Sequence, residues 1–421
     1  MRNLKIAVVG SGISGLSCAY YLSKNFKVDL FEKNSYFGGH THTQTIKYKG
    51  KNINVDSGFI VFNEINYPNL CNLFEELNVK SYESDMSFAV SNKIDNIEYS
   101  GTNLSSLFSQ KKNLLNFNFW RMLCEIVSFN LLAKKHIRKY KNYTIQEYLD
   151  LKNYSDYYKY KHLYPMAASI WSSEINEIKK YPFEKFVMFF VNHGLLKIIN
   201  RPKWRTVLDG SKNYVEKILR SKNISAYKNS SVRFLYRKEN KIFLDVKGKK
   251  KEYDHLVIAV HSDQVKKIIN LKKEEKKMFE DIRYTKNKVY VHSDRKLMPE
   301  SKKAWSSWNY IENKTNIRGV NVTYWMNKLQ NLGTDKNIFV SLNPYKKPEK
   351  NKIIKVISYE HPLYNFDTFR KQRKINIIQG RSNIWFCGAY LGYGFHEDGI
   401  SSSMNIARRI YKIEKEKFVE L

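Results

Sequence analysis

The sequence predicts an α/β protein in which a doubly wound parallel sheet carries an inserted α+β domain. Three apolar runs lead to this class. Residues 4–9 enter a glycine-rich turn, residues 253–260 form an acid-led run in the middle of the chain, and residues 383–387 enter a second glycine-rich segment. Short, nearly uninterrupted apolar runs are typical of parallel strands that are buried on both faces.

The first run opens a familiar supersecondary unit. Residues 4–9 predict a strand, residues 16–23 a helix, and residues 27–31 a second strand that ends at Glu32. The turn between the first strand and the helix reads Gly10-Ser11-Gly12-Ile13-Ser14-Gly15. Strand, glycine turn, helix, strand and acid in this order form the first half of a dinucleotide-binding βαβ unit.

Each residue type in this unit has a chemical reason. Gly10 permits the tight turn, Gly12 lets the backbone approach a pyrophosphate, and Gly15 lets the helix pack close to the sheet. The N-terminus of the helix offers unpaired N–H groups and the positive end of its dipole to phosphates. Glu32 follows Gly15 by 17 residues, where a carboxylate can accept hydrogen bonds from a ribose.

Further motifs indicate a ligand larger than one nucleotide. Lys33 is followed by Gly38-Gly39-His40-Thr41 and by Asp56-Ser57-Gly58-Phe59. Near the C-terminus, residues 388–399 are rich in glycine and lead into a predicted helix at residues 400–410. The glycine-rich segment thus leads to a second helix N-terminus near the end of the chain, and one bipartite ligand can contact both helix N-termini. We predict FAD as this bipartite ligand. The sequence contains no second complete βαβ glycine unit, so we do not expect a separate NAD(P)H domain.

The chain divides into two interleaved parts. A capped helix expected at residues 208–219 and the strand at residues 253–260 belong with the nucleotide site. The remaining blocks carry many aromatic residues and no nucleotide signature, so we assign them to substrate. The FAD-binding domain is predicted at residues 1–62, 203–268 and 376–421. The substrate-binding domain is predicted at residues 63–202 and 269–375.

Composition excludes several classes of protein. Hydrophobic residues make up 42% and aromatic residues 14% of the 421 residues, which excludes global disorder. No run reaches the roughly 18 uncharged apolar residues that a membrane-spanning helix needs. The four cysteines form no C-x-x-C pair, so we expect neither a zinc ribbon nor a disulfide scaffold. A reducing, cytoplasmic location fits best.

The charge balance has two explanations that stay open. Lysine and arginine number 73 against 40 acidic residues, which gives a formal net charge of +33. Either an anionic partner such as an acidic membrane surface selects this charge, or it reflects drift in an AT-biased genome. Residues 104–141 resemble a basic amphipathic helix on the inner face of a membrane, although a core-facing helix with a lysine-rich outer face gives the same pattern. We expect no nucleic-acid partner.

Together these motifs resemble the glycine-rich flavoprotein superfamily of amine oxidases, protoporphyrinogen oxidase and phytoene desaturases, whose FAD-binding domain is glutathione-reductase-like. A closer resemblance is to a bacterial family of NAD/FAD-binding flavoproteins often found with cyclopropane-fatty-acid-synthase-like methyltransferases. The motifs that carry it are GGHTHT at residues 38–43, VDSGFIVFN at 55–63, NHGLL at 192–196, RPKWRTV at 201–207, AVHSDQ at 259–264, VTYWMNKLQ at 322–330 and FCGAYLGYGFHEDGI at 386–400.

The resemblance implies a function and a set of cofactor contacts. Some members of the closer family are implicated in desaturating methylated fatty acyl chains, which implies a fatty acyl or phospholipid substrate and a methyltransferase partner. His40 and Ala389 depart from the wider superfamily, many members of which carry Arg or Lys at the first place and an acid or Thr at the second. The FAD-binding residues expected are Gly10, Ser11, Gly12, Ile13, Ser14, Gly15, Glu32, Lys33, Gly38, Gly39, His40, Thr41, Phe59, Val232, Gly388, Glu397, Asp398, Gly399 and Ile400.

His396 is the leading catalytic candidate, followed by Tyr390 and Glu397. On the amine-oxidase pattern His396 falls where an aromatic residue faces the flavin ring, and its unperturbed pKa of about 6.5 allows proton transfer. Glu397 then places its backbone N–H near the flavin N1/O2 edge, and Asp398 starts a helix whose dipole stabilises negative charge. The alternative is that His396 and Asp398 only cap this helix.

Other side chains keep two interpretations. Tyr390 and Tyr393 line the substrate channel or are simply packed aromatic residues. His40 and His42 share one face of a strand, but no third ligand stands at a suitable spacing, so we predict no metal site.

The predicted reaction is desaturase-type: a proton leaves an activated allylic carbon and a hydride passes to flavin N5, with oxygen or a quinone as the final oxidant. Three rivals remain: a redox-neutral double-bond isomerase, an amine oxidase, and a flavin-stabilised lipid-binding partner of a methyltransferase.

Overall fold

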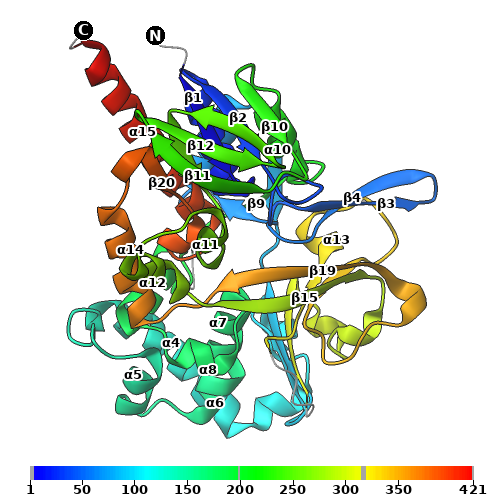
Figure 1. The fold of residues 1–421 in the computed structure, drawn as a ribbon. Coiled ribbons are helices and arrows are strands. Elements are labelled where there is room, and N and C mark those ends of the chain that lie inside the picture. The colour runs from blue at the N-terminus through cyan, green and yellow to red at the C-terminus, as the bar shows by residue number, and fades with distance from the viewer. Residues whose placement is uncertain (1–3, 198–199, 314–318, 420–421) are drawn as a thin grey trace.

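One end of the molecule is built on a five-stranded parallel sheet (Figure 1). The computed structural model describes residues 4–197, 200–313 and 319–419. The strand order is β10-β2-β1-β14-β20, so the N-terminal strand is central and the strand expected at residues 253–260 lies inside the sheet. All four neighbouring pairs are parallel. The strands are β1 (Lys5–Val9), β2 (Lys27–Phe31), β10 (Ile224–Tyr227), β14 (His255–Ile258) and β20 (Ile384–Phe386).

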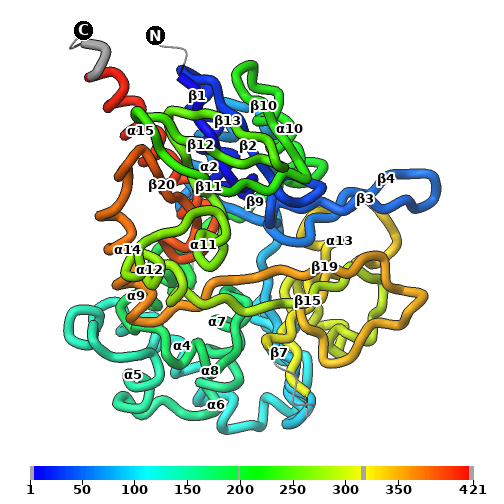
Figure 2. Tube along the Cα trace, in the orientation of Figure 1, coloured from blue at the N-terminus to red at the C-terminus, as the bar shows by residue number. Residues whose placement is uncertain are grey.

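The two faces of this sheet are covered differently. Ile6 and Val8 of β1 pack against helices, whereas Ala7 and Val9 face an antiparallel three-stranded sheet. This antiparallel sheet crosses the parallel strands in Figure 2 and shares that face with a few helices. The first face carries α1 (Ile13–Ser23), α2 (Pro68–Glu76), α10 (Lys212–Leu219) and α15 (His396–Val419). The second carries β11 (Val232–Lys238), β12 (Lys241–Val246) and β13 (Lys249–Tyr253), with α11 (Val265–Ile268), α12 (Lys273–Glu280) and α14 (Phe366–Ile377).

A seven-stranded sheet and a helical group form the other end of the molecule (Figure 1). The sheet takes strands from two distant segments in the order β19-β15-β18-β17-β16-β7-β8. Its strands are β7 (Phe88–Asn92), β8 (Ile97–Ser100), β15 (Tyr284–His292), β16 (Trp308–Glu312), β17 (Val322–Trp325), β18 (Phe339–Leu342) and β19 (Ile353–Pro362). The remaining helices are α3 (Leu104–Leu107), α4 (Phe117–His136), α5 (Ile145–Leu151), α6 (Asp156–Tyr158), α7 (Tyr164–Trp171), α8 (Ile175–Lys179), α9 (Phe183–Asn192) and α13 (Met326–Leu329).

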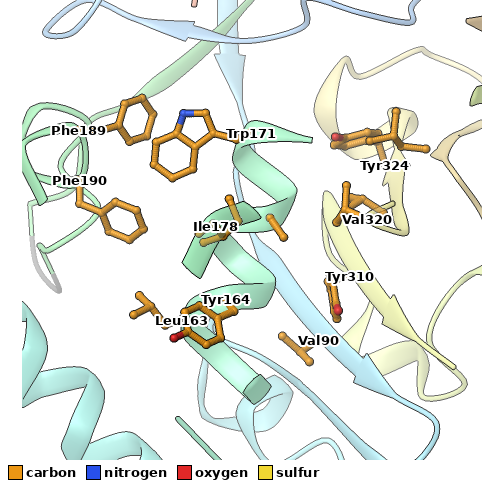
Figure 3. Packing of buried hydrophobic residues seen from close by; sticks show 14 of the residues in the cluster. Val90, Leu163, Tyr164, Trp171, Ile178, Phe189, Phe190, Tyr310, Val320 and Tyr324 are labelled. Atoms are coloured by element: carbon orange, nitrogen blue, oxygen red, sulfur yellow. The ribbon is translucent and has the colours of Figure 1, made fainter. Parts of the chain in front are cut away.

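The largest hydrophobic core joins these helices to the sheet. In Figure 3, Trp171 and Ile178 lie between Phe189 and Phe190 on one side and the strand residues on the other. Two smaller sheets connect the ends of the molecule. They are the hairpin of β3 (Thr43–Tyr48) and β4 (Lys51–Asp56), and the sheet of β5 (Phe62–Asn63), β9 (Trp204–Val207) and β6 (Ser81–Ser84).

Three sequence expectations about helices need correction. α15 starts at His396, four residues before the expected start, because the Asp398 carboxylate accepts the Phe395 N–H (2.9 Å) and closes the first turn. α10 starts at Lys212, and Ser211 does not cap it, since its hydroxyl donates to Asp56 Oδ1. Residues 104–141 do not form one helix: α3, the 3₁₀ helix η1 (Lys111–Leu115) and α4 follow one another.

Candidate functional site

The turn between β1 and α1 has the shape that a pyrophosphate needs. A Cβ atom built on Gly15 would lie 1.8 Å from the Gly10 carbonyl oxygen, so only glycine lets the helix start this close to the strand. A Cβ atom on Gly12 would meet no atom within 4 Å. Gly12 is also the N-cap of α1, where backbone N–H groups are unpaired. The open space in front of Gly12 therefore faces an anion-binding helix end.

Glu32 at the end of β2 is buried and braces this turn. Its Oε2 atom accepts hydrogen bonds from the Ser11 N–H (3.0 Å) and hydroxyl (2.7 Å). Oε1 accepts only the Asn34 N–H (2.9 Å) among the described residues. A carboxylate oxygen takes about two hydrogen bonds, so Oε1 keeps capacity for a ribose hydroxyl.

The glycine pair of residues 38–39 lies against the same turn. The Gly38 N–H donates to the Ser11 carbonyl (3.0 Å), and Gly39, at φ +60°, approaches Gly12 so closely that its Cβ would lie 3.0 Å from Gly12 Cα. The Phe59 N–H in turn donates to the His40 carbonyl (2.8 Å). Motifs that are separated in the sequence thus surround one space.

The first turn of α15 completes this space. Gly399 packs on α1, since a Cβ there would lie 2.8 Å from Ser14 Oγ. The His396 ring stacks on Phe59, with centroids 3.6 Å apart. His396 Nε2 lies 3.1 Å from both the Thr41 and the Tyr214 hydroxyl oxygens. The N-terminal ends of α1 and α15 therefore meet at one site, as the sequence predicted for a bipartite ligand.

The protonation state of His396 differs from the sequence expectation. Burial lowers the pKa of the imidazole to about 3, with a smaller contribution from His40. The ring is therefore neutral at pH 7, and so weak a base is poorly matched to proton abstraction at that pH. Its stacking on Phe59 and its two hydroxyl neighbours hold the ring in place.

The carboxylates of Glu397 and Asp398, which follow His396, accept hydrogen bonds from backbone N–H groups. Glu397 accepts from the Asn69 N–H (3.0 Å) and side-chain amide (2.6 Å) and from the Leu70 N–H (3.1 Å), which are at the start of α2. The Glu397 side chain thus caps α2, and the role predicted for Glu397 through its backbone N–H at the flavin edge stays a prediction. Burial raises the pKa of Asp398 to about 7, while backbone N–H groups oppose this shift.

The other predicted residues spread around the site. Lys33 is exposed, and its Nζ donates to Gln264 (3.1 Å). Val232 begins β11, two residues after Ser230, whose N–H donates to the Glu32 carbonyl (2.7 Å). Tyr390 packs in the core between β20, α14 and β11–β13, and burial raises its pKa well above the usual value. It lies on the 3₁₀ helix η8 (Ala389–Leu391), which follows Gly388. Packing is therefore the better-supported interpretation of Tyr390.

A histidine group beside the glycine pair was missed by sequence reasoning. The His40 ring lies 5.1 Å from that of His361, 4.9 Å from Tyr359 and 6.0 Å from His261, as centroid distances. Burial lowers the pKa of His40 to about 3 and of His261 to about 4. His42 turns away and stacks on Tyr36 (4.1 Å). Only the AVHSDQ motif hinted at His261, and no local spacing could join it to His40 or His361.

An aromatic surface reaches the start of α15 from the part of the chain that the sequence assigned to substrate binding. Phe395 stacks on Phe189 (4.8 Å), which also stacks on His193 (3.8 Å), and Tyr393 lies 5.9 Å from Phe369. Behind it, several buried polar atoms have no hydrogen-bond partner within the described ranges. They are Trp171 Nε1, Tyr181 Oη and Tyr364 Oη.

FAD fits the residues present. The space in front of Gly12 is open, two helix N-termini converge, and Glu32 Oε1 can accept a further hydrogen bond. His40 Nε2 is buried with no partner in the described part of the chain, and buried polar atoms normally have one. No group of three or more side chains among residues 4–197, 200–313 and 319–419 is arranged to hold a metal ion.

Comparisons with known proteins agree with this geometry. Residues 8–77 match a family model described as an NAD(P)-binding Rossmann-like domain. Over 58 residues the chain is 40% identical to protoporphyrinogen oxidase of Dictyostelium discoideum. That match covers 11% of this chain and 11% of that protein, so the likeness is local.

Solved structures resemble nearly the whole chain. A CLA-producing fatty acid isomerase from P. acnes has a TM-score of 0.69 at 16% identity, covering 97% of this chain and 99% of that one. Cyclohexylamine oxidase from Brevibacterium oxydans gives 0.68 at 12%, with 98% and 100% covered. Putrescine oxidase bound to putrescine gives 0.66 at 15%, with 97% and 99% covered. The chain therefore has the mixed α/β fold of amine-oxidase-like proteins.

Among the residues that the structure describes, no helix is long and apolar enough to cross a membrane.

Proposed function

We propose that this protein is an FAD-dependent oxidoreductase that acts on unsaturated or methyl-branched fatty acyl chains, with phospholipid as their carrier. When bound, FAD supplies a two-electron acceptor at N5 of its flavin ring. The cofactor part of the proposal is supported by the Gly12 space, the Glu32 carboxylate and the converging helix ends.

The observation that carries the substrate class is the apolar surface before α15. The Phe189 ring contacts those of Phe395 and Tyr393. The Tyr393 ring also contacts that of Phe369. The carboxylates of the first α15 turn are engaged elsewhere: Glu397 caps α2, and Asp398 accepts backbone N–H groups. An alkylammonium group would find no free carboxylate in that turn, whereas an acyl chain gains from burial among aromatic rings.

In this proposal the residues of the chain bind the cofactor, orient the reactants and exclude water. Backbone N–H groups at Gly12 and at the start of α15 would hold the negative charge of FAD, and Glu32 would accept a hydrogen bond from its ribose. His396, neutral and stacked on Phe59, forms a wall fixed through Thr41 and Tyr214. The buried aromatic residues keep water from the reacting carbon.

A second candidate, a redox-neutral acyl double-bond isomerase, is supported by the likeness to the fatty acid isomerase. In that case the product keeps the hydrogen count of the substrate and no final oxidant is consumed. A desaturase product has two hydrogens fewer.

The experiment supplies the yellow holoprotein with vesicles of phospholipid bearing monounsaturated or methyl-branched chains. We expect oxygen or quinone consumption and a product lighter by two hydrogens in mass spectrometry. A product of unchanged mass with a shifted double bond would support the isomerase. If no lipid changes and cyclohexylamine or putrescine is oxidised, both lipid activities are wrong and the protein is an amine oxidase. Lipid profiles of cells with and without the protein give the same comparison in vivo.

A further inference from the structure

The outward face of α4 carries an apolar stripe. Its members follow one another at intervals of three and four residues, which puts them on one side of the helix. A helix facing water would carry polar residues there. The members, which we call the α4 stripe, are Phe117 (79% exposed), Trp120 (46%), Cys124 (exposed), Val127 (42%) and Leu131 (63%).

The opposite face of α4 is already used by the core. Phe119, Met122, Phe129 and Ala133 are buried there. The stripe is therefore not the core-facing side of a helix with a lysine-rich exterior, which was the alternative for this segment. It is an additional apolar surface, and exposed apolar patches of this kind mark interaction sites.

The segments that precede α4 also expose apolar side chains. Leu114 is 47% exposed and Leu115 is 93% exposed on η1, and Leu104 is 76% exposed on α3. The Trp120 indole N–H donates to the Leu114 carbonyl (2.9 Å), which fixes η1 against α4. The helix α4, which carries the α4 stripe, lies in the helical group of Figure 1, at the opposite end from β12.

The segment that carries the α4 stripe is strongly basic. Residues 104–141 contain eight lysines and arginines and one acid, Glu125. Glu125 is engaged by Arg121 (3.2 Å) and by the Ser155 N–H (2.9 Å). The basic residues lie before and after the apolar members, which is the arrangement of a helix that rests in the plane of an anionic bilayer.

We propose that the α4 stripe and the basic residues beside it form a docking surface for an anionic lipid bilayer. A second copy of this chain is the less suitable occupant, because a two-fold contact would bring the same basic surfaces together. The protein would lie on the membrane, with the side chains of the stripe at the level of the acyl chains. This proposal is independent of the acyl substrate proposed above.

The test measures cosedimentation of the holoprotein with phosphatidylglycerol or phosphatidylcholine vesicles. We expect binding to the former to exceed binding to the latter by about tenfold or more, and to fall as salt rises from 0.1 to 1 M. Phe117→Ser/Leu131→Ser should lose binding, whereas Ile65→Ser/Ile377→Ser, with similarly exposed side chains (68% and 69%), should keep it.

A second matched pair isolates charge. Lys134→Glu/Lys135→Glu should reduce binding more than Lys247→Glu/Lys249→Glu, which changes net charge equally at the distant β12–β13 turn. Near-ultraviolet circular dichroism checks that each variant is folded. Equal binding to both vesicle types, or equal loss in both lysine pairs, would overturn the proposal. So would a dimer in sedimentation equilibrium that Phe117→Ser/Leu131→Ser converts to monomer, without vesicle binding by the parent protein.

Discussion

Gly12→Val should separate folding from cofactor binding. Gly12 has φ −66° and ψ 179°, which any residue can adopt, and a Cβ there meets no protein atom within 4 Å. The folding penalty is then mainly that of valine at an N-cap, about 1 kcal/mol. For a chain of this size, such a change lowers Tm by about 2–4 °C or less.

The effect on FAD should be far larger. The valine side chain would occupy the space of the pyrophosphate and remove its approach to the helix N–H groups. If two charge-assisted hydrogen bonds are lost at about 1.5–3 kcal/mol each, the Kd for FAD rises by about 10²–10⁴-fold. Purified Gly12→Val should be colourless, and calorimetric titration with FAD should give little or no heat.

Two other glycines make the comparison sharp. Gly101→Val is the matched control, because a Cβ on Gly101 also meets nothing within 4 Å, and this variant should stay yellow. Gly15→Val should fail to fold, since its Cβ would lie 1.8 Å from the Gly10 carbonyl oxygen. A yellow Gly12→Val protein with parental affinity would refute the placement of the pyrophosphate.

Three other predictions follow from the site. Glu32→Ala should weaken FAD binding by about 1.5–3 kcal/mol through the loss of charge-assisted hydrogen bonds, and unchanged affinity in fluorescence titration would move the ribose elsewhere. His396→Ala should stay yellow, with slower flavin reduction in stopped-flow bleaching. His396→Phe should lose less than the 10²–10⁴-fold typical of a missing acid or base, because the low pKa of the imidazole leaves it a packing role; equally slow Ala and Phe variants would restore proton transfer. Urea stability of the apoprotein should fall from pH 6.5 to pH 4, by about 1.4 kcal/mol per pH unit for each net proton that the unfolded chain binds. In the folded protein, burial holds the pKa values of His40, His261 and His396 at about 3 to 4, so these side chains take up protons in this window only when the chain unfolds. Asp398, with a pKa of about 7 in the folded protein, acts in the opposite sense and offsets one of these protons. Stability that stays constant or increases as the pH is lowered from 6.5 to 4 would contradict the burial of these imidazoles.

The nucleotide half of the site could be predicted because its signals are local. Gly10 to Gly15 and Glu32 lie in one short strand–turn–helix–strand segment, where spacing alone fixes their relative positions. The glycine of α15 was less informative. Gly399 suggested a later helix start, but it is a helical residue that lets α15 contact Ser14 of α1.

The remaining features could not be predicted, because they depend on contacts between segments that are distant in the sequence. Nothing in the spacing of His40, His261 and His361 indicates that β14 and β19 bring them together. The direction of the Glu397 side chain depends on where α2 begins, which the residues around position 397 do not encode. The exposure of the α4 stripe was also hidden, because α4 is apolar on both faces and a pattern cannot tell which face is covered.

The most direct test of the proposed function is anaerobic stopped-flow mixing of the holoprotein with a monounsaturated or methyl-branched phospholipid. The flavin absorbance near 450 nm reports electron transfer, and cyclohexylamine serves as the competing substrate class. We predict bleaching with the lipid, formation of an acyl product lighter by two hydrogens, and no bleaching with the amine. Bleaching with the amine, and none with any lipid, would contradict an oxidoreductase of fatty acyl chains.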